Sequence, residues 1–127
     1  MSQATFDELR GRLAEISDLV KTAALLGWDQ HVMMPRGGAT LRAEQLATVG
    51  RIAHTKFTSP EIGKLLDDVR DWSEQQEYDS LEASLVRVAS HDWEKLRQVP
   101  ADLRAEMSRS AALAIPVWVE ARNENDF

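Results

Sequence analysis

The chain has 127 residues, 15 of them basic and 21 acidic, so its formal net charge is −6. This length suits one domain with one core, and acidic residues in mixed-sign clusters argue against a nucleic-acid or anionic-membrane surface. The absence of cysteine excludes disulfides, thiolate zinc sites and cysteine nucleophiles, while sites built from histidine and carboxylates stay open.

The sequence predicts neither a signal peptide nor a membrane-spanning segment. The start, "MSQATFDELR", has no basic region leading into an apolar one, so it does not resemble a signal peptide. The longest apolar run, residues 111–119, is interrupted by Pro116 and is too short to span a bilayer. We therefore expect a soluble, cytoplasmic protein with no membrane partner.

The first predicted helix has apolar residues at alternating steps of three and four, which places them on one face. Thr5 and Glu8 have the spacing of a capping box and predict its start. Gly27 is typical of a residue that ends a helix, so the helix should stop near Trp28. The apolar face consists of Phe6, Leu9, Leu13, Ile16, Val20 and Ala23.

A corner should follow. Pro35 would stiffen the turn, Gly37 and Gly38 would take positive φ, and Asp29 would satisfy exposed amides in the bend. The second predicted helix, residues 39–57, has a stripe of mostly small residues, which permits close approach of a neighbouring helix. The stripe consists of Ala39, Ala43, Leu46, Gly50, Ala53 and Phe57.

Two further helices are predicted from their caps. Ser59 supplies an N-cap and Pro60 a first-turn proline for a third helix. Residues 73–80 are polar and read as a link, with Asp79 and Glu82 as a second capping box. The inward residues should be Ile62, Leu65, Leu66, Val69 and Trp72 on the third helix, and Leu81, Leu85, Val88, Ala89 and Leu96 on the fourth.

Pro100 can open a fifth helix, in which Pro116 removes one backbone hydrogen bond and clashes with the Ala112 carbonyl, so a kink or break is expected. No segment alternates with period two. The prediction is therefore all-α: about five helices in an antiparallel bundle or hairpin array, no sheet, and a single helical domain over residues 1–127. The inward residues of the fifth helix should be Leu103, Met107, Ala111, Ala114 and Trp118.

Few residues point to chemistry. His31, His54 and His91 form no H-x-x-x-H or H-E-x-x-H pair, so we expect them to face solvent or make single hydrogen bonds. Asp67 and Asp68 diverge by about 100° around a helix, which indicates a solvated face rather than a carboxylate dyad. From the residues alone, the chain is a helical domain without an assigned catalytic or metal site.

Several sequence blocks in a fixed order carry a resemblance. They are "GWDQ" at 27–30, "MP" and "GG" at 34–38, "RAEQ" at 42–45 and the terminal "NDF". Together they resemble the N-terminal region of the carboxypeptidase Taq family of zinc metallocarboxypeptidases. The positions that the resemblance marks are Trp28, Asp29, Gln30, Pro35, Gly37, Gly38, Arg42, Glu44 and Gln45.

The resemblance implies a hydrolase that removes C-terminal residues from peptides, with zinc held by the histidines of H-E-x-x-H and a downstream glutamate. This chain lacks that motif, so no catalytic or metal residue is assigned to it. Zinc is expected only in the full-length parent, whose catalytic region would be the chain's partner. The 127 residues alone should be inactive.

Two functions stay open at this point. The chain is either the lid or cleft wall of such a peptidase, or a stand-alone or degenerate helical module for oligomerisation or interaction. The marked corner is likewise either structural or a substrate contact through Trp28 or Gln30. Because residues 111–119 are apolar almost all round, we also expect a homodimer.

Overall fold

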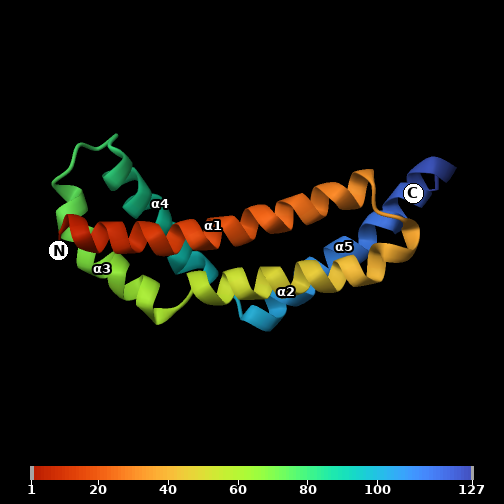
Figure 1. The fold of residues 1–127 in the computed structure, drawn as a ribbon, viewed down its shortest axis with the longest axis horizontal. Coiled ribbons are helices and arrows are strands. Elements are labelled where there is room, and N and C mark those ends of the chain that lie inside the picture. The colour runs from red at the N-terminus through yellow and green to blue at the C-terminus, as the bar shows by residue number, and fades with distance from the viewer. Residues whose placement is uncertain (1, 127) are drawn as a thin grey trace. The chain divides into compact units, whose positions relative to one another are not determined.

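The computed structural model describes residues 2–126 and contains only helical elements in that range (Figure 1). The predicted all-α class with five helices is confirmed. None of the helices within the described range is long and apolar enough to cross a membrane. The elements are α1 (Gln3–Val32), a 3₁₀ helix η1 (Arg36–Gly38), α2 (Ala39–Phe57), α3 (Pro60–Glu74), α4 (Leu81–Leu96) and α5 (Ala101–Glu124).

The chain folds as two compact units. The first contains the chain up to Asp18 together with His54–Pro100, and the second contains Leu19–Ala53 and the chain from Ala101 onward. The helices α1 and α2 therefore each contribute residues to both units, whereas α3 and α4 belong to the first unit and α5 to the second.

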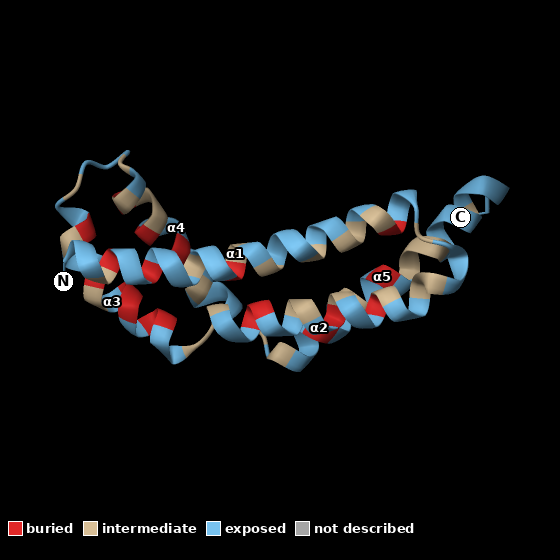
Figure 2. Ribbon diagram, viewed as in Figure 1, coloured by how far each residue is buried: buried red, intermediate tan, exposed pale blue. Residues whose placement is uncertain are grey.

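The first unit has an apolar core in which α3 packs on α4 and on the start of α1 (Figure 2). Phe6 is buried, and its ring centroid lies 5.5 Å from that of Trp72. A Cβ atom at Gly63 would lie only 2.4 Å from Cζ2 of Trp93, so α3 and α4 can approach this closely only because residue 63 has no side chain. The core residues are Phe6, Leu9, Ile16, Ile62, Leu65, Leu66, Val69, Val86 and Ala89.

Small residues hold the second unit together. Ala43 and Ala47 of α2 are buried, as are Ala105 and Ala112 of α5. A Cβ atom at Gly50 would lie 3.1 Å from the Ser108 hydroxyl oxygen, which places these two helices in close contact. The stripe predicted for residues 39–57 thus lies against a neighbouring helix, as expected for small residues.

The predicted start of the first helix is wrong. The helix begins at Gln3, two residues before Thr5, and the Ser2 hydroxyl accepts a hydrogen bond from the Thr5 amide at 3.4 Å. Glu8 accepts instead from Arg12, one turn further on, at 3.1 Å. The capping-box spacing is present in the sequence, but an earlier hydroxyl takes the capping position.

Of the predicted caps of α3 and α4, one is confirmed and one is wrong. Ser59 caps α3 from an extended backbone with Pro60 in the first turn, so this prediction is confirmed. The second capping box is wrong, because Ser80 rather than Asp79 occupies the N-cap of α4 and accepts from the Ala83 amide at 3.2 Å. The adjacent hydroxyl competes successfully with the carboxylate for the same role.

The predicted end of the first helix is also wrong. The helix passes through Gly27 and continues to Val32, a course that costs about 1 kcal/mol for an interior glycine. The bend that follows is closed by the backbone carbonyl of Asp29, which accepts from the amides of residues 33 and 34, both at 3.0 Å. Among the described residues no glycine has positive φ, so that expectation for Gly37 and Gly38 is wrong, and both lie in the 3₁₀ helix instead.

The predicted inward faces of the last two helices are only partly right, because Ala89 is buried and Leu85 packs against the core while several other predicted residues are exposed. Buried positions on α4 are Ala83, Val86 and Ala89, and those on α5 are Ala105 and Ala112. On α5 the buried residues are both alanines, whereas on α4 Leu85 and Trp93 also pack against the core. The predicted inward residues that prove exposed are Val20, Leu81, Val88, Leu96, Leu103, Met107, Ala111 and Trp118.

The proline of the fifth helix does not break it. The helix α5 continues through Pro116 to Glu124, so the break allowed by the sequence does not occur. A side chain from α1 donates to the carbonyl that Pro116 leaves without its helical donor.

Candidate functional site

The marked corner lies in the second unit, and Arg42 is its central residue. Its guanidinium donates from Nη1 to the Leu26 carbonyl oxygen at 2.7 Å, from Nη2 to Oδ2 of Asp29 at 2.9 Å, and from Nε to Oε1 of Gln45 at 3.0 Å. The Arg42 side chain is 16% exposed, so these charge-assisted bonds are partly shielded from water. They join the last turns of α1 to the start of α2.

The role predicted for the Asp29 side chain is corrected by these contacts. Its carboxylate binds Arg42, and it is the Asp29 backbone carbonyl that receives the amides of the bend. The amides of residues 33 and 34 point back to a carbonyl of the helix, so they need no side-chain acceptor, and the Asp29 carboxylate reaches a cation on the adjacent helix instead.

Gln30 links the end of α1 to α5. Its side-chain Nε2 donates to the Ala112 carbonyl oxygen at 2.8 Å. In a regular helix this carbonyl would accept from the amide of residue 116, which is absent because residue 116 is proline. Gln30 therefore supplies the donor that Pro116 lacks. A buried acceptor without a donor costs about 1–3 kcal/mol, which explains why the satisfied helix continues.

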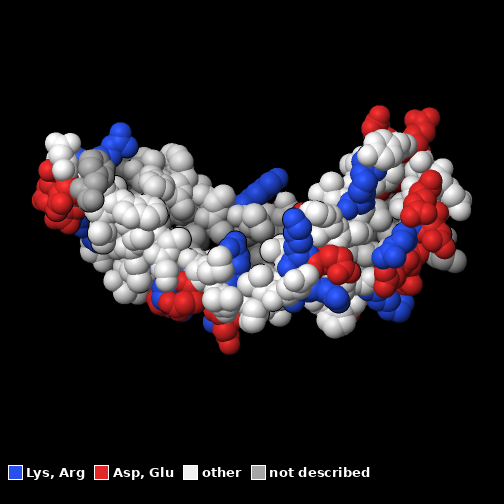
Figure 3. All heavy atoms as spheres, turned by 180° about the vertical axis from the view of Figure 1, so that it is seen from behind, with Lys and Arg blue, Asp and Glu red and all other residues white. Residues whose placement is uncertain are grey.

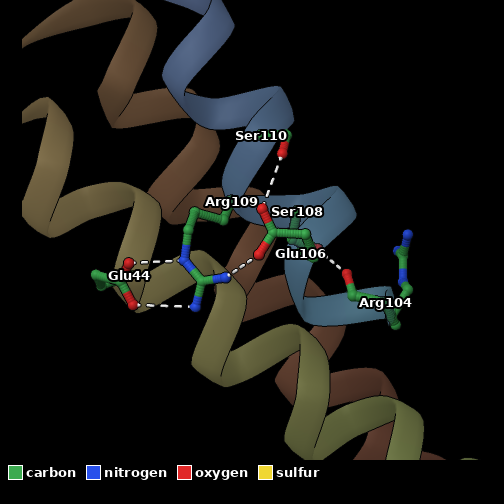
Figure 4. Close-up of polar contacts among 6 residues, drawn as sticks. All are labelled: Glu44, Arg104, Glu106, Ser108, Arg109 and Ser110. Atoms are coloured by element: carbon green, nitrogen blue, oxygen red, sulfur yellow. Dashed lines mark hydrogen bonds and ion pairs between the residues drawn. The ribbon is translucent and has the colours of Figure 1, made fainter. Parts of the chain in front are cut away.

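Glu44 contacts α5 through an ion pair (Figure 4). Arg109 donates from Nε to Oε1 of Glu44 at 2.7 Å and from Nη2 to Oε2 at 3.2 Å, and its third branch binds Glu106. The hydrogen bond from Arg109 lowers the pKa of Glu44 below 4.5, and the same bond raises the pKa of Arg109. The Glu44 side chain is 55% exposed, so solvent screening weakens this pair.

The remaining marked residues make no such polar links. Trp28 is 58% exposed. Pro35 has extended backbone angles, φ −67° and ψ 153°, and precedes η1. A Cβ atom at Gly37 would meet nothing within 4 Å, whereas one at Gly38 would lie 3.1 Å from Cγ of Met34. The corner thus brings Asp29, Arg42 and Gln45 together, while Gln30 and Glu44 each contact α5.

Sequence reasoning missed the partners of these residues. Ala112 and Arg109 lie in α5, and no spacing rule connects them with Gln30 or Glu44. A proline inside a predicted helix is the one signal available, because it implies a free carbonyl four residues earlier for which a donor must be found.

The described residues do not fit a metal site. Over residues 2–126, no group of three or more histidine, aspartate or glutamate side chains is placed to hold a metal ion. His54 is buried with its Nε2 2.6 Å from the Val99 carbonyl oxygen, while His31 and His91 are exposed. On the face drawn in Figure 3, basic and acidic side chains lie among one another.

Comparison with known proteins identifies relatives. The family model described as "Carboxypeptidase Taq (M32) metallopeptidase" matches residues 8–127. Thermostable carboxypeptidase 1 of Thermus thermophilus is 32% identical over 125 residues, which are 98% of this chain and 24% of that protein. The protein of the same name from Pyrococcus furiosus is 26% identical over 123 residues, 97% of this chain and 24% of its own length. No solved structure matches significantly.

The chain thus spans about a quarter of the length of these curated relatives. The family match covers nearly all of it, including the corner formed by Asp29, Arg42 and Gln45. The chain therefore belongs to the carboxypeptidase Taq family of metallopeptidases.

Proposed function

We propose that the chain is the N-terminal helical part of a zinc-dependent metallocarboxypeptidase that removes C-terminal residues from peptides, and that it helps to form the substrate cleft. The observation that carries this proposal is the family match over residues 8–127.

The contacts of the second unit suit the wall of a cleft. Arg42 joins α1 to α2, Gln30 joins α1 to α5, and Arg109 joins α5 to α2. Three cross-links among three helices restrict their relative movement. A binding wall works best when its supporting side chains are held by packing and hydrogen bonds, because a loose wall loses binding energy to ordering.

A chimaeric enzyme tests this proposal. The matched quarter of the Thermus thermophilus protein would be replaced by this chain, and release of C-terminal residues from peptides would be measured with and without a chelator. We expect chelator-sensitive release by the chimaera, little release by the relative lacking that quarter, and a reduced rate for the chimaera carrying Arg42→Ala. Equal release with and without the quarter would contradict the proposal.

A second candidate, an oligomerisation module, is favoured by one specific observation. Leu113, Val117 and Trp118 of α5 are 42%, 63% and 67% exposed. Burying a few hundred Å² of such surface at about 25 cal/mol per Å² contributes several kcal/mol before association costs. We propose that this face forms a homodimer, the commonest closed assembly.

Sedimentation velocity over about a hundredfold concentration range tests the homodimer. The unsubstituted 127-residue chain should shift from monomer to dimer as its concentration rises, and the Trp118→Lys variant should stay monomeric. Leu41→Lys is the matched control, because Leu41 is also exposed but lies on α2. If the unsubstituted chain sediments as a monomer at every concentration, self-association is ruled out.

A further inference from the structure

An open pocket lies in the first unit, where α3, α4 and the link between them come together (Figure 1). Its volume is about 430 Å³, within the range of roughly 300–1,000 Å³ that is usual for small-molecule sites. Ala83 and Val86 of α4 line it and are only 8% and 4% exposed. Tyr78, from the link, lines it as well. The pocket thus offers an apolar surface to the body of a small organic molecule.

Arg87 lines the same pocket, and its guanidinium is held in place by neutral groups. Nη1 donates to the Tyr78 carbonyl oxygen at 3.3 Å, and Nη2 donates to the Ser84 hydroxyl oxygen at 3.4 Å. Its Cζ lies 4.1 Å from the centroid of the Tyr78 ring, which is a cation–π contact. Arg87 is exposed and makes no ion pair with any residue in the described range, so its charge is positioned without being neutralised. The other N–H groups of the guanidinium, including that of Nε, stay available to a ligand.

Two other charged residues line the pocket. Arg70 donates from Nη2 to Oδ1 of Asp67 at 2.7 Å, so its charge already has a partner. Glu74 is exposed and makes no ion pair with any residue over 2–126. A ligand with one negative charge gains the contact with Arg87, whereas a second negative charge adds to the repulsion from Glu74 and finds no second unpaired arginine among the lining residues. The charges therefore favour a monoanion.

We propose that this pocket binds a small aromatic monocarboxylate, with its ring against Val86 and Tyr78 and its carboxylate on the Arg87 guanidinium. The planar guanidinium fork matches the two oxygens of a carboxylate, and aromatic rings pack well on a tyrosine ring and on guanidinium planes. Because Arg87 is already held by Tyr78 and Ser84, binding costs little further ordering of its side chain. Such a ligand site goes beyond the proposed part in a peptidase.

Tyr78 is the only tyrosine of the chain, so ¹³C labelling of tyrosine rings gives NMR signals from this pocket alone. Three matched probes test the proposal. Indole-3-acetate has both the ring and the carboxylate, indole-3-acetamide has the same ring and no charge, and acetate has the charge and no ring. We expect saturable shifts of the Tyr78 ring signals with indole-3-acetate, at least about tenfold weaker binding of indole-3-acetamide, and no saturable shift with acetate at the same concentrations.

Three variants complete the experiment. Arg87→Gln should weaken binding of indole-3-acetate at least about tenfold and leave binding of indole-3-acetamide within about twofold, because only the acid has a charge for the guanidinium. Glu74→Gln should strengthen binding of indole-3-acetate by about two- to fivefold, since a repelling carboxylate is removed. Asp71→Asn is the control for this gain, because Asp71 is exposed on α3 and does not line the pocket. It should bind like the unsubstituted chain.

Absence of saturable Tyr78 shifts at millimolar indole-3-acetate, or equal binding of the acid and the amide, would overturn the proposed site. So would an equal loss of acid and amide binding in Arg87→Gln, because the arginine would then only hold Tyr78 in place. A gain in Asp71→Asn as large as that in Glu74→Gln would show that the general surface charge acts instead of the pocket. The titration involves no hydrolysis, so its result does not depend on the outcome of the chimaeric enzyme.

Discussion

The Gln30 side chain donates to the carbonyl oxygen of Ala112 at 2.8 Å, across a separation of 82 residues. That carbonyl is the one that Pro116 deprives of its helical donor. The pair explains two departures from local expectation together. The first helix extends past Gly27 far enough to place Gln30 beside α5, and α5 continues through its proline.

This relationship predicts an energetic coupling between Gln30 and Pro116. Gln30→Met should destabilise the parent by about 1–3 kcal/mol, because it leaves the Ala112 carbonyl without a donor. In a Pro116→Ala background the same substitution should cost less, because the amide of residue 116 can then reach this carbonyl. Urea unfolding of the four proteins gives the coupling free energy. If Gln30→Met lowers the free energy of unfolding equally in both backgrounds, the Gln30 side chain does not replace the missing amide of residue 116.

Gly63 should not tolerate a methyl group. In an open helix position, glycine to alanine stabilises by up to about 1 kcal/mol. At Gly63 the added carbon would lie 2.4 Å from Cζ2 of Trp93, so Gly63→Ala should instead destabilise by about 1–3 kcal/mol. Gly11→Ala is the control, because a Cβ atom there meets nothing within 4 Å. Thermal unfolding should move in opposite directions for the two variants, and a melting temperature of Gly63→Ala at or above that of the parent contradicts the close contact.

The two glycines of the corner should differ from each other. Neither has positive φ, so a side chain is limited by contacts rather than by backbone strain. Gly38→Ala would place a carbon 3.1 Å from Cγ of Met34 and should destabilise by about 1 kcal/mol. Gly37→Ala meets no neighbour and should change stability by less than about 0.5 kcal/mol. Chemical denaturation of both variants measures the difference, which would vanish if Met34 moved aside freely.

The Glu44–Arg109 pair should add an acid-dependent part to stability. The hydrogen bond from Arg109 lowers the pKa of Glu44 in the folded protein below 4.5. A lowered folded pKa stabilises at pH values above the unfolded pKa, and this stabilisation is lost as pH falls through the folded pKa. Glu44→Gln should therefore be less stable than the parent near neutral pH and converge with it as pH falls below 4.5.

Salt provides the control for this prediction. At about 1 M salt the Debye length is roughly 3 Å, so the neutral-pH difference between the parent and Glu44→Gln should shrink. Denaturant midpoints across the pH range, at low and high salt, measure both effects. A constant difference between the two proteins at every pH would show that the lost contact is not ionic.

The isolated chain should neither retain stoichiometric zinc nor release C-terminal residues from peptides. The described residues offer no group of three metal-binding side chains, and the sequence has no H-E-x-x-H motif. Metal analysis after dialysis, together with a peptide hydrolysis assay, measures both properties. Tightly held zinc at one equivalent, or hydrolysis abolished by a chelator, would contradict the expectation.

Local signals in the sequence determined the helical class and some of the helix starts. Ser59 and Pro60 start α3 as predicted, since capping depends on neighbouring amides only. The apolar face of α3 was likewise predictable, because its large residues recur with the helical period and all have the same core to enter. The order of sequence blocks also indicated the family, which the family match over residues 8–127 shows.

Only the tertiary structure decided which faces of α4 and α5 are buried, where α1 ends and how the corner is used. Val86 is buried and Val88 is exposed because two residues along a helix turn the side chain by about 200°, and the sequence does not say which of the two faces meets the core. On α5, Ala112 is buried and Trp118 is exposed. The helix passes Gly27 because contacts of its last turn offset the local cost of glycine. Partners such as Gln30 and Ala112 are distant in sequence, and periodicity within one helix contains no information about the residue that another helix presents to it.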